Sequence, residues 1–258
     1  MPSPSFNPDK ELAEFFTDVE HLRDMFNNSV AAPTLPKRLL VIHGVGGVGK
    51  SSLLRMFRLH CKSVHVPVAL ASGDESKSAL DVLARWTEDL KADGVAFPAF
   101  GKTHEHYRAI QAKVDTQAKK AQDARGRAAD IAGKAASKTA EAAGGALAGA
   151  AIGSVIPGIG TAIGGALGGV LGGMGAEALV DWLRGFLTKP DIDLLLDPAK
   201  KLTDDFLADI APATDKRRIV LMLDTFEQMT ALDDWARDVA QRVGQISNWP
   251  TGQITNLS

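Results

Sequence analysis

Cysteine, aromatic residues and net charge are all scarce in this sequence. Cys61 is the single cysteine, which excludes an internal disulfide and fits a reducing compartment such as the cytoplasm. A net charge of −2 over 258 residues gives no reason to expect a nucleic-acid partner. With 45% hydrophobic and 23% charged residues, the chain can nevertheless bury the core of one large or two small domains.

A glycine-rich stretch lies between a strand-like run that ends at Ile42 and a helix-like run that begins near Ser52. Its spacing from Gly44 to Ser51 is that of the phosphate loop, G-x-x-x-x-G-K-[ST]. Glycines let several backbone N–H groups point at one anion, and the helix that follows adds the positive end of its dipole. We expect Lys50 to reach the β- and γ-phosphates and the Ser51 hydroxyl to ligate Mg²⁺. The predicted nucleotide-binding residues are Gly44, Val45, Gly46, Gly47, Val48, Gly49, Lys50, Ser51 and Ser52.

Composition divides the chain into residues 1–106, an alanine- and glycine-rich insert at 107–190, and residues 191–258. In the first part, apolar spacing and turn residues predict alternating helices and strands. The predicted elements are helix 9–28, strand 37–43, helix 51–61, strand 66–71, helix 74–93 and loop 95–103. His104 and His106 come next. Without a distant third ligand, they indicate a solvated loop rather than a metal site.

The insert opens with a basic, alanine-rich segment, 107–141, whose composition favours helix but whose thin apolar face should not build a core alone. Residues 142–176 then carry no charge, and glycine recurs at every fourth position on either side of Pro157-Gly158. This pattern predicts a helical hairpin with a glycine-zipper-like stripe, whose second arm continues as an amphipathic tail through Arg184. Three interpretations stay open: membrane insertion, which the basic flanks favour, a close-packed hairpin or contact between copies of the chain, and disorder.

The last part contains a predicted helix at 198–210 and then five consecutive apolar residues, 219–223, which are typical of a strand buried on both faces. Asp224 follows at the position where a second ligand on the Mg²⁺ side belongs, and Glu227 is the candidate general base. The alternative is that Asp224 is a helix N-cap and Glu227 is solvated. The helix side chains expected to face inward are Leu202, Phe206, Leu207 and Ile210.

Two of these segments resemble those of a known family. Residues 40–54 look like the phosphate loop of the signal-transduction ATPases with numerous domains (STAND), a group within the AAA+-like NTPases, and residues 221–228 resemble their Walker B segment. The resemblance implies an α/β P-loop core with a doubly wound parallel sheet, and ATP bound at residues 44–52. It also implies Mg²⁺ held through Ser51 and Asp224, and an ATP-controlled switch between inactive and assembled states. Many members carry two acidic residues after the strand, whereas Gln228 occupies the second position here.

The family continues into a sensor strand, which lies between the phosphate-loop strand and the Walker B strand, and then into a last strand and a helical lid. Here only a helix at 233–243 and a strand at 253–257 can follow. We therefore expect a gap in the sheet and a chain that is a piece of a longer protein.

Two functional hypotheses follow from these observations. The first is a regulatory ATPase in which Lys50, Asp224 and Glu227 act on Mg²⁺-ATP, while the segment 142–176 serves assembly or membrane contact. The second is a membrane-active or oligomerising module that is not an enzyme and whose nucleotide site is vestigial. A guanine-reading pattern, [NT]-K-x-D, also occurs at 188–191, but it precedes the 219–223 strand, so a chance match is the better interpretation.

Overall fold

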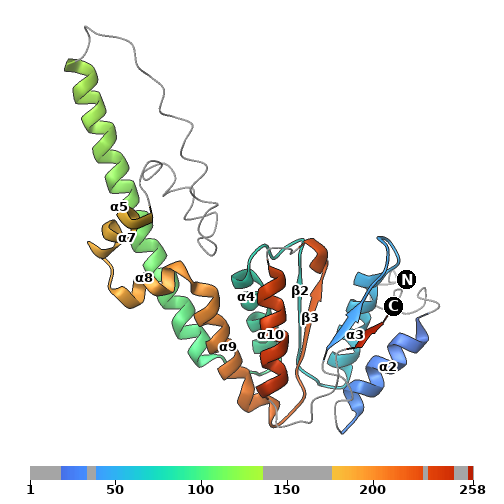
Figure 1. The fold of residues 1–258 in the computed structure, drawn as a ribbon. Coiled ribbons are helices and arrows are strands. Elements are labelled where there is room, and N and C mark those ends of the chain that lie inside the picture. The colour runs from blue at the N-terminus through green and yellow to red at the C-terminus, as the bar shows by residue number, and fades with distance from the viewer. Residues whose placement is uncertain (1–18, 34–38, 136–175, 229–231, 247–254, 258) are drawn as a thin grey trace, which may run out of the picture. The chain divides into compact units, whose positions relative to one another are not determined.

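The computed structural model of the chain describes residues 19–33, 39–135, 176–228, 232–246 and 255–257. The fold is α/β and mostly helical, and its strands pair in parallel (Figure 1). The chain divides into two compact units, one formed by Met1–Ala99 with Thr203–Ser258 and the other by Phe100–Leu202. The glycine-rich loop and Asp224 both belong to the first unit.

Strands β2 (Val68–Ser72) and β3 (Val220–Asp224) form a parallel pair in the first unit. Val68 lies opposite Val220, and Ser72 lies opposite Asp224. Both strands were predicted to within two residues at each end, because each is a short apolar run bounded by polar or turn residues. The register brings the C-terminal ends of the two strands together, and this edge carries the site described below.

The outer edge of β2 is closed by carboxylates instead of another strand. The backbone N–H groups of Val68 and Leu70 donate to the side chains of Asp93 and Asp89, at 3.0 and 3.1 Å. Asp89 lies in the last turns of helix α4 (Ala79–Ala92), and Asp93 is its C-cap. Since an open strand edge can pair with another chain, these two side chains protect β2 from doing so.

Helix α4 begins later than the predicted start at residue 74. The Ser78 hydroxyl accepts from the Asp81 backbone N–H, and the Asp81 carboxylate accepts from the Ser78 N–H, which makes a capping box. This local hydrogen-bonding pattern fixes the first turn, so residues 73–77 form a turn between β2 and the helix. Apolar periodicity alone could not locate that boundary.

Helix α3 (Lys50–Ser63) packs against β2 and β3 and carries the core on one face of the pair. Leu53, Phe57 and Cys61 of this helix are fully or nearly fully buried together with Val68 of β2. Helix α2 (Glu20–Ala31) lies against α3, where the ring of Phe26 stacks on Phe57 with centroids 4.0 Å apart. The helix predicted over 9–28 is confirmed in its described part, and residues 9–18 lie outside the described residues.

Aromatic side chains fill a second core in the same unit. Trp86 of α4 lies 6.0 Å from both Phe206 of α9 (Pro198–Thr214) and Trp235 of α10 (Asp233–Ile246), measured between ring centroids. The indole N–H of Trp86 donates to the Met222 carbonyl of β3 at 3.0 Å, which ties this core to the strand. The inward-facing residues predicted for the 198–210 helix are confirmed as buried: Leu202, Phe206, Leu207 and Ile210.

Strand β1 (Leu40–Ile42) pairs in parallel with β4 (Thr255–Leu257). Among the described strands, this pair and the β2–β3 pair form separate sheets. The doubly wound sheet that the family resemblance implies therefore stays a prediction, and the described strands form two parallel pairs. No described strand joins β1 to β3, which agrees with the predicted gap in the sheet.

In the second unit, helix α5 (Pro98–Ala135) corrects the predicted loop at 95–103. Proline is compatible with a helix start, because the first N–H groups have no partner within the helix and its fixed φ suits the first turn. His104 and His106 consequently lie on a helix and not in a loop. The same helix buries Tyr107, Ile110 and Val114 at helical spacing, so its apolar face is broader than the alanine-rich composition predicted.

Helices α7 (Ala176–Arg184) and α8 (Lys189–Leu196) pack on each other in this unit. Leu183 of α7 and Leu195 of α8 are almost wholly buried. No helix among the described residues has both the length and the apolar character needed to cross a membrane. Residues 142–175 of the glycine-rich run 142–176 lie outside the described residues, so the predicted hairpin stays a prediction.

Candidate functional site

The glycine-rich loop at residues 44–49 connects β1 to the first turn of α3. Gly47 and Gly49 adopt φ values of 83° and 88°, in the left-handed region that residues with a side chain rarely enter. A Cβ at Gly44 would lie 2.9 Å from a methyl group of Val48, so this position also requires glycine. The loop therefore curls tightly just before the N-terminus of α3, where unpaired backbone N–H groups and the helix dipole favour an anion.

Lys50 is the first residue of α3, and its side chain turns back over this loop. Its Nζ donates to the carbonyls of Gly44 and Val45 at 2.9 and 3.1 Å. The ammonium group therefore lies over the loop, and the positive charge of Lys50 is next to the space that the loop encloses. Ordinary helix propensity does not explain this conformation, because an exposed lysine on a helix would extend into solvent.

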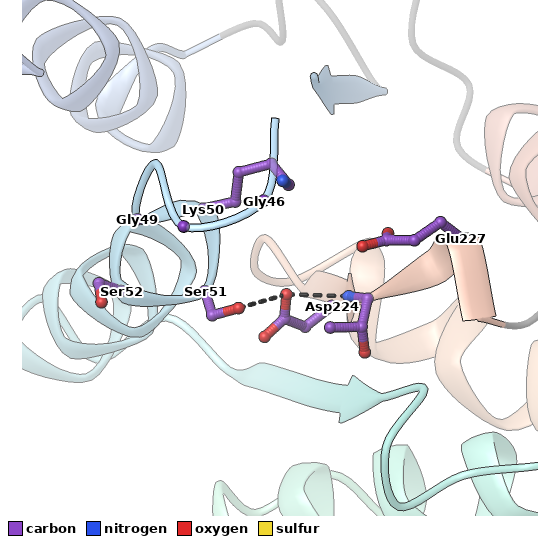
Figure 2. A pocket seen from close by; sticks show the side chains of 9 residues that line it. Gly46, Gly49, Lys50, Ser51, Ser52, Asp224 and Glu227 are labelled. Carbon is purple, nitrogen blue, oxygen red and sulfur yellow. Dashed lines mark hydrogen bonds between the residues drawn. The ribbon is translucent and has the colours of Figure 1, made fainter. Parts of the chain in front are cut away.

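Ser51 and Asp224 come together although 173 positions separate them in the chain. The Ser51 hydroxyl donates to Asp224 Oδ1 at 3.0 Å, and the Thr225 backbone N–H donates to the same oxygen at 2.9 Å. Figure 2 shows the two side chains facing each other, one from the start of α3 and one from the end of β3. The Asp224 carboxylate thus contacts the main chain that follows it, as a capping residue would, and it also contacts Ser51 at the start of α3.

A cavity of about 360 Å³ lies between the loop and the end of β3. Its volume is within the range of pockets that hold small ligands. Glu227 projects toward it from the short 3₁₀ helix η1 (Phe226–Gln228), and this side chain is exposed (Figure 2). The residues that line the cavity are Gly46, Gly47, Gly49, Lys50, Ser51, Ser52, Asp224, Thr225 and Glu227.

The cavity contains most of the residues predicted to bind nucleotide. Gly44, Val45 and Val48 are in the loop but do not line the cavity, and the two valines are 75% and 53% exposed. Thr225 lines the cavity and was not predicted, since neither its residue type nor the motif around it marks it as functional. What distinguishes Thr225 is its backbone φ of 50°, which the sequence does not predict.

Magnesium is the metal that the oxygen donors of this site fit. A serine hydroxyl and a carboxylate are hard ligands, and Mg²⁺ is usually held by one or two protein oxygens while phosphate and water complete its shell. In the part of the chain that the structure describes, no three or more His, Cys, Asp or Glu side chains converge as a metal-binding group. A site built from Ser51 and Asp224 needs no such group.

The histidines at 104 and 106 have other partners. His104 stacks on Phe100 with ring centroids 5.5 Å apart, and His106 Nε2 lies 2.8 Å from Asp191 Oδ1 of α8. Asp191 also forms a capping box with Thr188, and the hydrogen bond from that hydroxyl is the main cause of a lowered pKa for its carboxyl. Residues 188–191 thus begin a helix, which accounts for the [NT]-K-x-D pattern without a guanine.

Comparisons with protein-family models, with curated proteins and with solved structures found no significant match.

Proposed function

We propose that this chain is an ATP-binding regulatory NTPase that holds Mg²⁺-ATP between residues 44–52 and the end of β3. The observation that carries the proposal is the convergence of Lys50, Ser51 and Asp224 on one cavity. A curled loop of N–H groups, a lysine and a hydroxyl–carboxylate pair are the components that P-loop enzymes use for a polyphosphate and its metal. The resemblance to STAND ATPases supports the same proposal.

Each component has a distinct role in this proposal. The backbone N–H groups at residues 46–51 bind the β-phosphate, and Lys50 exchanges one of its loop carbonyls for a phosphate oxygen. Ser51 and Asp224, whose oxygens meet at the cavity, would hold Mg²⁺. Held by these residues, Mg²⁺ would supply positive charge to offset that of the phosphates.

Hydrolysis requires a group that orients water, and Glu227 is the candidate. It lines the cavity from η1, and its exposure leaves its carboxylate free to accept a proton from a water molecule beside the terminal phosphate. The neighbouring Gln228 carries an amide, which cannot accept a proton as a base at neutral pH. We propose that ATP binding, and slow hydrolysis through Glu227, switch the chain between conformational or assembly states.

Two binding measurements and one rate measurement test this function. A fluorescent ATP analogue should bind more tightly in Mg²⁺ than in EDTA, and Asp224→Asn should remove that difference. Asp215→Asn, an exposed acid outside the site, is the matched control and should leave it unchanged. Phosphate release should fall in Glu227→Gln while ATP binding stays the same. If the parent protein does not bind the analogue in either condition, the proposed function is wrong.

The glycine-rich run 142–176 is proposed as the assembly or membrane-acting part of the chain. Its support is the four-residue glycine spacing, which lets helices approach closely. Liposome flotation of the full chain and of a variant lacking these residues, each with and without ATP, tests the membrane role. Equal flotation of both proteins would remove it, and sedimentation of the same two proteins would then test contact between copies of the chain.

A further inference from the structure

We infer that Ser72, at the end of β2, is a positioning residue of the nucleotide site. It does not line the cavity, and no motif in the sequence marks it. Its hydroxyl is hydrogen-bonded to the Thr225 hydroxyl at 3.1 Å, and Thr225 in turn contacts the Asp224 carboxylate. The inference rests on the proposed function and adds to it a residue that sets the geometry of the metal side.

Thr225 has an unusual backbone conformation directly after Asp224. Its φ of 50° lies in the left-handed region, where a β-branched side chain is disfavoured. Such a conformation persists only when surrounding contacts hold it. Because residue 225 begins the turn into η1, its conformation decides the direction of both the Asp224 carboxylate before it and Glu227 two positions later.

Three hydrogen bonds hold residue 225 in place. Its N–H donates to Asp224 Oδ1, its carbonyl accepts from the Gln228 N–H at 2.9 Å, and its hydroxyl pairs with Ser72. The first two are local and would form in many turns. The bond to Ser72 is the one that connects the turn to another strand, so it fixes the turn relative to the sheet.

Ser72 is itself held firmly. Its carbonyl accepts from the N–H groups of Glu75 and Ser76, and its hydroxyl accepts from the Asp74 N–H at 3.3 Å. The next residue, Gly73, donates its N–H to the Asp224 carbonyl at 3.0 Å. The end of β2 therefore provides a rigid reference against which Asp224 and the residue after it are oriented.

Loss of the Ser72 hydroxyl should release residue 225 toward negative φ. The Thr225 N–H would then leave Asp224 Oδ1, and the carboxylate would lose the orientation that directs it at Ser51. Among the hydrogen bonds of the described residues, none joins Ser72 to the glycine-rich loop or to Lys50, so the phosphate-binding half of the site should stay intact. The expected defect is thus specific to the metal side.

The test measures ATP affinity in Mg²⁺ and in EDTA for four proteins: the parent, Ser72→Ala, Thr225→Val and the double variant. Ser72→Ala should lower affinity in Mg²⁺ about fivefold, the usual effect of one hydrogen bond, and leave affinity in EDTA unchanged. Thr225→Val, which replaces the hydroxyl by a methyl group, should do the same. The double variant should be no worse than either single variant, because both remove one interaction.

Ser63→Ala is the matched control. The Ser63 hydroxyl donates to the His60 carbonyl at the far end of α3, so its loss should change neither affinity. Equal losses in Mg²⁺ and EDTA for Ser72→Ala, or strictly additive effects in the double variant, would overturn the inference. Urea unfolding of each variant shows whether it is folded. If Ser72→Ala does not fold, Thr225→Val decides the outcome.

A second readout needs no nucleotide. Backbone chemical shifts of residue 225 report the sign of φ, and hydrogen exchange of its amide reports the bond to Asp224. Ser72→Ala should shift residue 225 out of the left-handed region and speed exchange of its amide. An unchanged residue 225 would overturn the inference even if ATP binds. Absence of ATP binding by the parent would instead refute the proposed function, while this readout still decides the role of Ser72.

Discussion

Asp89 offers the sharpest test of the packing that holds the site's strands in place. Its carboxylate accepts from the Leu70 N–H of β2 at 3.1 Å and from Arg58 Nη2 of α3 at 2.9 Å. Arg85 of its own helix lies 3.4 Å away. The side chain of Asp89 is only 9% exposed, so one buried charge joins α4, β2 and α3. If this junction stabilises the unit, removing the charge of Asp89 should lower the free energy of unfolding.

Asp89→Asn keeps the shape of the side chain and removes its charge. The single amide oxygen can accept from Leu70 or from Arg58 but no longer attracts the guanidinium as an ion. Hydrogen bonds to charged groups contribute about 1.5–3 kcal/mol each. We therefore expect the free energy of unfolding to fall by about 2–3 kcal/mol. With an m value of about 2–3 kcal/mol/M in urea, the midpoint should fall by about 1 M.

Equilibrium urea unfolding, followed by circular dichroism and tryptophan fluorescence, measures this change. Glu88→Gln is the control, because the Glu88 side chain is next to Asp89 in the chain, is 75% exposed and forms an exposed ion pair with Arg85 at 3.3 Å. Such an exposed pair should contribute at most about 0.5 kcal/mol. In a double-mutant cycle with Arg58→Ala, the effects of the two substitutions should not add. Equal midpoints for Asp89→Asn and Glu88→Gln would refute the reasoning.

Three further predictions follow from buried or capped groups. Burial raises the pKa of the Cys61 thiol from 9.0 to about 12, so iodoacetamide at pH 8 should label this cysteine in urea but not in the native protein. Arg218 donates to the backbone carbonyls at the C-terminal end of α2, those of Ser29, Val30 (2.5 Å) and Ala32 (2.8 Å). Arg218→Ala should therefore lower the free energy of unfolding by about 2 kcal/mol in the same urea assay. The Thr188 hydroxyl lowers the pKa of Asp191 below 3.8, so the N-cap of α8 should contribute stability above pH 4 and lose it as pH falls through the lowered pKa. In an acid titration followed by circular dichroism, this loss of stability should appear in the parent and be absent in Asp191→Asn.

Local patterns predicted much of the fold. The apolar runs before Gly44 and Asp224 gave strands, and the spacing of Leu202, Phe206 and Ile210 gave a buried helix face. Where a single residue sets a boundary, periodicity failed. With Ser78 as its N-cap, α4 begins five residues after the predicted start, and Pro98 begins a helix where a loop was expected. In both cases the chemistry of the first helical turn outweighs the apolar pattern.

The site was predictable only in part for a similar reason. Lys50, Ser51 and Asp224 lie in short motifs whose residue types follow from phosphate and metal chemistry, so sequence identifies them. Ser72 and Thr225 matter because the β2–β3 register places Ser72 opposite Asp224, 152 positions away in the chain. No local pattern encodes that pairing or the positive φ of residue 225.

Isothermal titration of Mg²⁺-ATP into three proteins is the most direct test of the proposed nucleotide site. The parent and Lys62→Ala, which changes an exposed lysine at the other end of α3, should release the same binding heat with the same affinity. Lys50→Ala should release none at the same concentrations, because the ammonium group over the loop is missing. Equal affinity of the Lys50 and Lys62 variants would mean that residues 44–51 do not bind the triphosphate.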